Sequence, residues 1–166
     1  MLLIILFFNE NNLNGQHTLD IVAGIGFPEL LSTGVRAQLN QVQIGFKIGS
    51  FPFCESTFLT LSGEVYYHFG DHPTFTRRKI TYVKAALNYF KNENVWEKDV
   101  TVLVGTSVGR DIYITHKIGI NLDGGLFFKI KDIKMKKELF YSSNSVSLPA
   151  LSWVMPYVAV TLFYRL

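Results

Sequence analysis

Three side chains of the hydrolase type alternate within one short segment of the chain. Ser62, Glu64 and His68 could supply a nucleophile, a carboxylate and a base. In an extended segment, however, residues two apart are separated by roughly 7 Å and residues four apart by roughly 13 Å, which exceeds the reach of a hydrogen bond. We therefore interpret the three side chains as structural, and we predict no catalytic residue and no enzyme activity.

Seven charged residues form a second group, which the alternation of the sequence places on one face of a series of strands. Because both signs occur, the group suits a narrow interior in which buried charges must be paired. The residues are Asp20, Glu64 and Asp123 with Arg36, Lys47, Lys84 and Arg165. We interpret them as a structural polar network in the lumen of a barrel. Glu64 is expected to pair with Lys84, and Asp20 either approaches Arg165 or is solvated independently at the barrel mouth.

Metal, cofactor and nucleic-acid binding find little support in the sequence. Cys54 is the only cysteine, so paired thiolates cannot hold a metal, and the four histidines are scattered along the chain. The glycines alternate along extended segments instead of opening a helix, which argues against a phosphate-binding loop. The net charge of +3 is too small to indicate nucleic acid. We predict no metal, no cofactor and no nucleic-acid partner.

The last eleven residues show the kind of element that positions these side chains. Val160 and Leu162 point to one side of the expected strand, and Thr161 and Phe163 point to the other. Comparable alternation recurs in segment after segment. The longest uninterrupted apolar run, Met1–Phe8, falls far short of the roughly 20 residues of a membrane-spanning helix. The pattern therefore excludes a helical membrane protein and predicts an all-β chain.

The segments predict a closed antiparallel up-and-down β-barrel of eight strands. The expected strands are residues 18–27, two within 31–49, and then 58–69, 80–92, 99–114, 118–131 and 152–166. The apolar positions change phase at Asn40-Gln41, which requires either a two-residue turn or a bulge. The turn gives eight strands and the bulge gives seven. We prefer the turn, because single-chain bacterial barrels have even strand numbers. Arg110 falls on the apolar face, which suggests a bulge or the exit of the strand from the membrane.

The connections alternate in length. Asn40-Gln41 and residues 115–117 are tight, whereas 50–57, 92–98 and 132–151 are longer and polar. The tight ones are expected on the periplasmic side and the longer ones outside, with 70–79 as a long exception. The charged run from Lys131 either extends the seventh strand or forms a loop. The 132–151 loop is the expected place for contact with a protein partner.

The polar face decides between a barrel surrounded by lipid and a soluble barrel of the lipocalin type, whose apolar face points inward. Small residues suit a crowded lumen better than a solvated surface. The inward glycines are expected to be Gly24, Gly26, Gly45, Gly49, Gly105, Gly109 and Gly125. Aromatic residues lie near the expected strand ends, as in membrane girdles. These are Tyr67, Phe69 and Tyr164 at one end and Phe46, Tyr89 and Phe128 at the other.

On these features the chain resembles the small outer-membrane β-barrel proteins of Gram-negative bacteria, from about Thr18 to Leu166. The terminal segment Val158–Leu166 is similar to the signal that the barrel-assembly machinery reads, although many members end on Phe or Trp. The Gly34-Val-Arg-Ala-Gln-Leu pattern adds to the resemblance. It implies a porin-like fold in the bacterial outer membrane, contact with membrane lipid and lipopolysaccharide, and a filled lumen with a structural or surface-binding role. A lipid-modifying enzyme and a soluble ligand-binding barrel stay open as alternatives.

The first residues read as a processing segment. The apolar start of the chain, followed by a polar stretch and Gly15, resembles a secretory signal peptide without its basic region. We expect residues 1–15 to be a truncated signal peptide and residues 16–166 to form the barrel domain. A short strand-like leader is the alternative.

Overall fold

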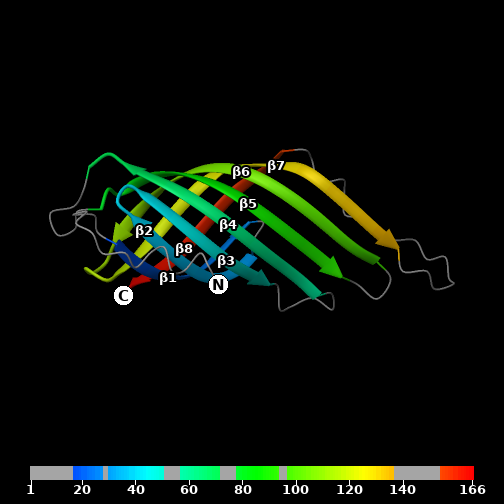
Figure 1. Cartoon of the computed structure of the whole chain (residues 1–166), viewed down its shortest axis with the longest axis horizontal. Helices are drawn as coiled ribbons and strands as arrows, with labels where there is room; N and C mark the ends of the chain where they lie inside the picture. Colours follow the sequence, from blue (N-terminus) through cyan, green and yellow to red (C-terminus); the bar gives the residue numbers. More distant parts are fainter. Residues whose placement is uncertain (1–16, 28–29, 51–56, 72–77, 94–96, 137–153) are drawn as a thin grey trace, which may run out of the picture.

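The protein forms a closed barrel of eight antiparallel strands, each hydrogen-bonded to its neighbours in the chain, with the last strand closing on the first (Figure 1). The computed structural model describes residues 17–27, 30–50, 57–71, 78–93, 97–136 and 154–166. The strands are β1 His17–Phe27, β2 Leu30–Leu39, β3 Val42–Ser50, β4 Thr57–Phe69, β5 Thr81–Glu93, β6 Glu97–Tyr113, β7 Ile118–Lys136 and β8 Val154–Arg165. The predicted fold class is confirmed, while the expected signal peptide lies outside the described residues.

The predicted turn between the second and third strands is also confirmed. Leu39 pairs with Val42, so that Asn40 and Gln41 alone connect β2 to β3. Asn40 has a positive φ of 59°, a conformation that asparagine adopts more readily than most residues. The turn reverses the chain without a bulge, and this accounts for the change of phase in the apolar pattern.

The strands are staggered as barrel closure requires. Paired residues can be followed once around the wall, from β1 through every strand and back to β1. They are His17, Leu39, Val42, Tyr67, Val83, Val108, Gly124, Val158 and Phe27, the last lying ten residues beyond the first. With a rise of about 3.3 Å per residue and a strand spacing of about 4.8 Å, this stagger corresponds to a tilt of about 40°. The tilt is visible in Figure 1.

The structure narrows the alternatives that the sequence left open for β6 and β7. The ladder is continuous at Arg110, which pairs with Thr81 and Leu122, so no bulge lies there; the register shifts instead between Val102 and Leu103. In addition, β7 continues to Lys136, so the charged run from Lys131 extends the seventh strand, as one of the two alternatives predicted, and residues 132–136 do not belong to the predicted 132–151 loop. Their backbones pair with β6 as far as Glu97, and this pairing offsets the weak strand signal of a charged sequence. The rest of that loop falls mostly in 137–153, outside the described residues.

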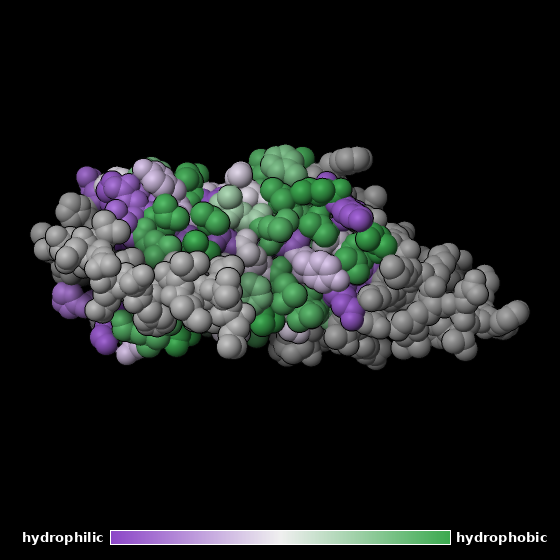
Figure 2. Space-filling model, in the orientation of Figure 1, coloured by the Kyte–Doolittle hydropathy of each residue, from purple (hydrophilic) through white to green (hydrophobic). Residues whose placement is uncertain are grey.

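The exterior of the barrel is apolar, and the interior holds the polar and charged side chains together with several aromatic and apolar ones. On β8, Val158 and Leu162 are 64% and 51% exposed, whereas Thr161 and Phe163 are each 1% exposed. Figure 2 shows hydrophobic side chains across the middle of the visible face, with hydrophilic ones mainly toward one end and a few toward the other. A soluble ligand-binding barrel would require the opposite arrangement of faces. Among the described residues, no helix is long and apolar enough to cross a membrane.

The two ends of the barrel differ in character. We call the end that holds Asn40-Gln41 and residues 114–117 the turn end, and the opposite end the loop end. The interior at the loop end is filled by an apolar cluster. It consists of Ala86, Phe90, Leu103, Phe127, Met155, Tyr157 and Ala159, with Phe58 packed against it. The charged side chains therefore lie between this cluster and the turn end.

Inward glycines make room for the aromatic rings that fill the barrel. Three such rings lie across a glycine of the neighbouring strand, so that a Cβ on the glycine would collide with ring carbons. The pairs are Phe127 on Gly105, Tyr82 on Gly109 and Phe163 on Gly119. Small residues on the inner face are thus required by their large neighbours, which is the physical reason for the predicted small-residue face.

We expect Gly109→Ala to destabilise the barrel by about 1–3 kcal/mol, because the Tyr82 ring would have to leave its position in a filled interior. Gly63→Ala is the matched control, since a Cβ at this outward position would meet nothing within 4 Å. Urea unfolding of both variants in lipid vesicles measures the difference. Equal stability of the two variants would contradict the proposed close approach of ring and glycine.

Candidate functional site

The candidate site is the charged network that fills the barrel between the apolar cluster and the turn end. The structure places all seven predicted residues on the inner face of the wall. Asp20, Arg36, Lys47, Glu64, Lys84 and Asp123 are buried, and Arg165 is partly exposed at the turn end. Each of the seven lies on a different strand, with Glu64 and Lys84 on the adjacent strands β4 and β5, so the barrel wall alone brings the charges together.

The middle of the network is organised around Glu64. Its carboxylate lies 3.0 Å from Lys47 Nζ and 3.5 Å from Lys84 Nζ, and it accepts a hydrogen bond from the Tyr66 hydroxyl. Lys84 also forms an ion pair with Asp123. The predicted Glu64–Lys84 pair is therefore confirmed, but each of its members has a second partner of opposite charge. Sharing of this kind satisfies more of the lone pairs and protons than an isolated buried pair would.

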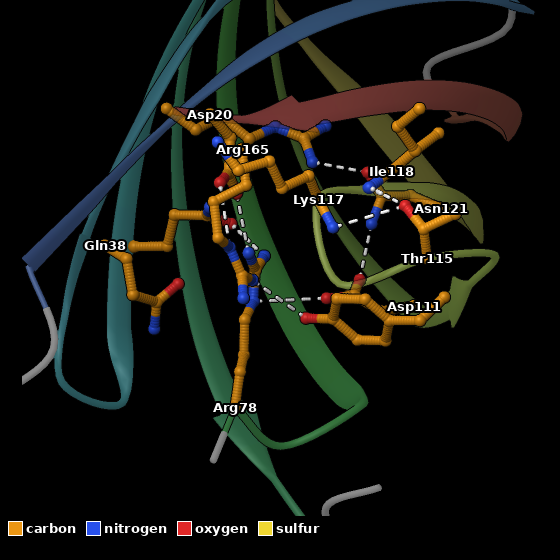
Figure 3. A network of polar contacts seen from close by, with 12 residues as sticks. Asp20, Gln38, Arg78, Asp111, Thr115, Lys117, Ile118, Asn121 and Arg165 are labelled. Atoms are coloured by element: carbon orange, nitrogen blue, oxygen red, sulfur yellow. Dashed lines mark hydrogen bonds and ion pairs between the residues drawn. The ribbon is translucent and has the colours of Figure 1, made fainter. Parts of the chain in front are cut away.

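A second cluster lies at the turn end, where β1 and β8 close the barrel. Asp20 Oδ1 is 3.5 Å from Arg165 Nε, so the approach predicted from closure is confirmed. The shorter contact of Asp20, however, is with Arg78, at 2.6 Å. Arg78 also lies 3.2 Å from the Asp111 carboxylate and donates a hydrogen bond of 2.9 Å to Gln43. Figure 3 shows Asp20, Arg78, Arg165 and Asp111 converging in this way.

Sequence reasoning missed both Arg78 and Asp111. Asp111 could have been found, because it shares the parity of the inward residues of β6. Arg78 precedes β5 and belongs to a connection, where no periodicity indicates the direction of a side chain. It is nevertheless buried, at 6% exposure, where it contacts the carboxylates of Asp20 and Asp111.

Asn121 links the two clusters. It accepts a hydrogen bond of 2.6 Å from Arg36 and donates one to Asp111. The Arg36 guanidinium in turn lies over the Tyr66 ring, 4.6 Å from its centroid. A chain of polar contacts thus runs from Arg165 at the barrel mouth to Lys47 and Lys84 beneath the apolar cluster.

Arg78 retains its charge in this setting. Burial by itself would lower the pKa of the Arg78 guanidinium, but the carboxylates of Asp111 and Asp20 raise it above its ordinary value. The network then contains five cations and four carboxylates, counting Arg78 and Asp111 with the seven predicted residues. This close balance is what burial of so many ionised groups requires.

The arrangement does not form a hydrolytic site from the three residues considered first. Glu64 is engaged by two lysines and a tyrosine. The two ring nitrogens of His68 lie 3.1 Å from the Lys79 carbonyl and 3.4 Å from the Gln43 side chain. Glu64 and His68 therefore belong to different clusters. Within the part of the chain that the structure describes, no group of three or more His, Cys, Asp or Glu residues could hold a metal ion.

Side chains fill the interior of the barrel in the apolar cluster and throughout the charged network. Arg36, Tyr66, Tyr82, Phe127 and Tyr157 are among the largest fully buried ones. Eight strands leave an interior about wide enough for side chains alone. Chemically, the site is suited to holding the wall together through paired charges.

Comparison with known proteins supports the fold. No protein-family model matches the chain, and no curated protein matches it. Among solved structures it is similar to the crystal structure of Acinetobacter baumannii CarO, at 13% identity and a TM-score of 0.50, over 95% of this chain and 100% of that chain. Two de novo designed transmembrane β-barrels also match. One, TMB2.3, solved by NMR, has 13% identity and a TM-score of 0.47, over 93% of this chain and 98% of its own length. The other has 11% identity and a TM-score of 0.49, over 90% of this chain and 95% of its own length. At these identities the similarity concerns the eight-stranded barrel fold.

Proposed function

We propose that the protein is an integral β-barrel of the bacterial outer membrane, with a filled polar lumen and a structural or surface-binding role in place of an open pore. One observation carries the proposal: the apolar side chains cover the outside of the cylinder while paired charges are enclosed within it. In water this arrangement would expose a large apolar surface, whereas in a bilayer the same surface contacts acyl chains.

The exterior aromatic residues support the proposed membrane position. Tyr67, Phe69 and Tyr164 are exposed close to the turn end, and Tyr89 and Phe128 are exposed toward the loop end. Two aromatic belts separated by an apolar band are typical of barrels in outer membranes. The prediction for Phe46 is wrong in detail, because Phe46 is the central residue of β3 and lies within the band.

The proposed partners follow from this position. The exterior contacts membrane lipid and, on the proposed outer side, lipopolysaccharide, while the terminal segment of β8 is the part that the barrel-assembly machinery would read. The predicted protein-partner segment 132–151 lies mostly outside the described residues. We propose no enzymatic activity: a lipid-modifying enzyme would need an accessible nucleophile and base, and Ser62 and His68 are each only 1% exposed.

Electrophoresis and conductance test the proposal together. We expect the protein to fractionate with outer membranes and to migrate faster in detergent gels before heating than after it, as a barrel that resists unfolding would. In planar bilayers we expect no stable open conductance, because large side chains occupy the lumen. Recovery in the aqueous fraction would contradict the membrane location. Steady conductance steps would contradict the filled lumen.

A further inference from the structure

Three buried polar groups on neighbouring strands have no hydrogen-bond partner among the residues that the structure describes. They are the hydroxyl of Tyr82 on β5, the hydroxyl of Ser107 on β6 and the Oδ1 atom of Asp123 on β7. The three residues are 0%, 5% and 6% exposed. A buried polar atom without a partner costs stability, and native proteins satisfy nearly all such atoms through protein groups or ordered water. Whether one partner can serve all three depends on how close together they lie.

The strand register brings the Tyr82 hydroxyl next to Asp123. Gly109 on β6 pairs with Tyr82 on one side and with Asp123 on the other. The end of the Tyr82 side chain, including its hydroxyl, occupies the place where a Cβ on Gly109 would lie. The hydroxyl therefore reaches over β6, and from there the backbone of β7 is about one strand spacing away, roughly 4.8 Å.

Ser107 approaches the same place from the next row of paired residues. It pairs with Gly125, and its Cβ lies only 2.6 Å from where a Cβ on Gly125 would be, so that the serine side chain leans toward β7. Asp123 lies two residues before Gly125, and diagonal neighbours of this kind have Cα atoms roughly 7–8 Å apart. The other carboxylate oxygen of Asp123 is paired with Lys84, the residue opposite Ser107 on β5. The carboxyl group is therefore turned toward this corner of the lumen.

We infer that an ordered water molecule binds between Tyr82, Ser107 and Asp123. A buried water typically forms about three hydrogen bonds, and this one donates to Oδ1 of Asp123 and accepts from the two hydroxyls. The charges favour a neutral ligand. An anion would be repelled by the carboxylate, and a cation would add to a network that already holds five cations against four carboxylates. The inference goes beyond the proposed function, because the site lies inside the barrel and does not depend on what surrounds it.

The direction of a stability change tests the site in the full-length protein. A Ser107 hydroxyl without any partner would make Ser107→Ala stabilising, since the substitution would remove an unsatisfied buried group. A hydroxyl bound to water makes the same substitution destabilising, and we expect the equilibrium constant of unfolding to rise roughly fivefold, as for the loss of one hydrogen bond. Tyr82→Phe keeps the ring over Gly109 and is expected to act in the same direction. Urea unfolding in lipid vesicles measures both variants.

The double variant Tyr82→Phe/Ser107→Ala tests whether the two hydroxyls share one ligand. Because the first substitution already weakens the binding of the water, we expect the double variant to lose less stability than the two single variants combined. Exactly additive effects would contradict a shared water. If Tyr82→Phe fails to fold, the sign of the Ser107→Ala effect decides alone, and stabilisation by Ser107→Ala would overturn the inference.

A crystal structure of the wild-type protein, at a resolution that shows ordered waters, tests the position directly. We expect a density peak within hydrogen-bonding distance of the Tyr82 hydroxyl, the Ser107 hydroxyl and Oδ1 of Asp123. The peak should be lost in crystals of the double variant. Direct hydrogen bonds from the two hydroxyls to Asp123, with no peak between them, would overturn the inference and leave the proposed function intact.

Discussion

Replacing Arg78 with methionine is expected to destabilise the folded barrel by about 3–5 kcal/mol, the usual cost of removing one partner from a buried ion pair. Arg78 neutralises Asp20 at 2.6 Å and Asp111 at 3.2 Å, and all three side chains are almost fully buried. Methionine keeps much of the side-chain volume, so the loss reports charge more than packing. Urea unfolding of the variant in lipid vesicles, compared with wild type, measures it.

The matched control removes the carboxylates as well. In the triple variant Arg78→Met/Asp20→Asn/Asp111→Asn the uncompensated negative charge is gone, so we expect much of the lost stability to return. The defect of Arg78→Met alone should also shrink as the pH is lowered, because protonation neutralises the orphaned carboxylates. A loss that is independent of pH and persists in the triple variant would show that Arg78 acts through packing and not through its charge.

The second large effect is expected on the outside of the barrel. Val160 lies near the middle of β8 and is 43% exposed on the outer face. If that face contacts hydrocarbon, Val160→Arg should cost about 2–4 kcal/mol, the range for a cation near the bilayer midplane. The yield of heat-modifiable protein after folding into vesicles, together with urea unfolding of the folded fraction, measures the change.

Val160→Leu is the conservative control and should fold as wild type does, because an apolar side chain is replaced by another facing the same environment. The contrast between the two substitutions separates charge from size. If Val160→Arg folds into vesicles with wild-type stability, this part of the exterior does not lie in hydrocarbon, and the proposed membrane position is wrong. On a water-exposed surface the same change would be nearly neutral.

The turn-end cluster illustrates how local contacts and barrel closure depend on each other. Asp20 belongs to β1 and Arg165 to β8, and these strands meet only when the barrel closes. Arg78 contributes from the β4–β5 side and reaches Asp111 on β6. One buried guanidinium therefore connects parts of the wall that the backbone ladder joins only by going around the barrel. This is why its removal is expected to have a larger effect than the loss of a surface ion pair.

Alternation along the strands was sufficient to determine the fold and the direction of most side chains. Successive residues of a strand point to opposite faces, so the apolar face of β8 and the inward positions of Asp20, Glu64 and Asp123 follow from parity alone. The phase change at Asn40-Gln41 allowed seven or eight strands, and the preference for an even strand number selected the turn that the structure shows. Parity also places Asp111 inside and Arg110 outside. Arg110 looked anomalous because it is a charged residue on the apolar face, but the ladder is continuous there and contains no bulge.

Strand order predicts the Glu64–Lys84 and Asp20–Arg165 contacts, but tertiary structure decided the other contacts among the charges. Parity assigns a side chain to the lumen but carries no information on its height or on the strand opposite, and both depend on the ten-residue stagger of the closed wall. The sharing of Glu64 between Lys47 and Lys84 depends on that stagger, as does the link through Asn121. The burial of Arg78 could not be predicted from alternation, because a residue in a connection has no periodicity. The direction of its side chain is set by its contacts with Asp20 and Asp111 at the barrel mouth.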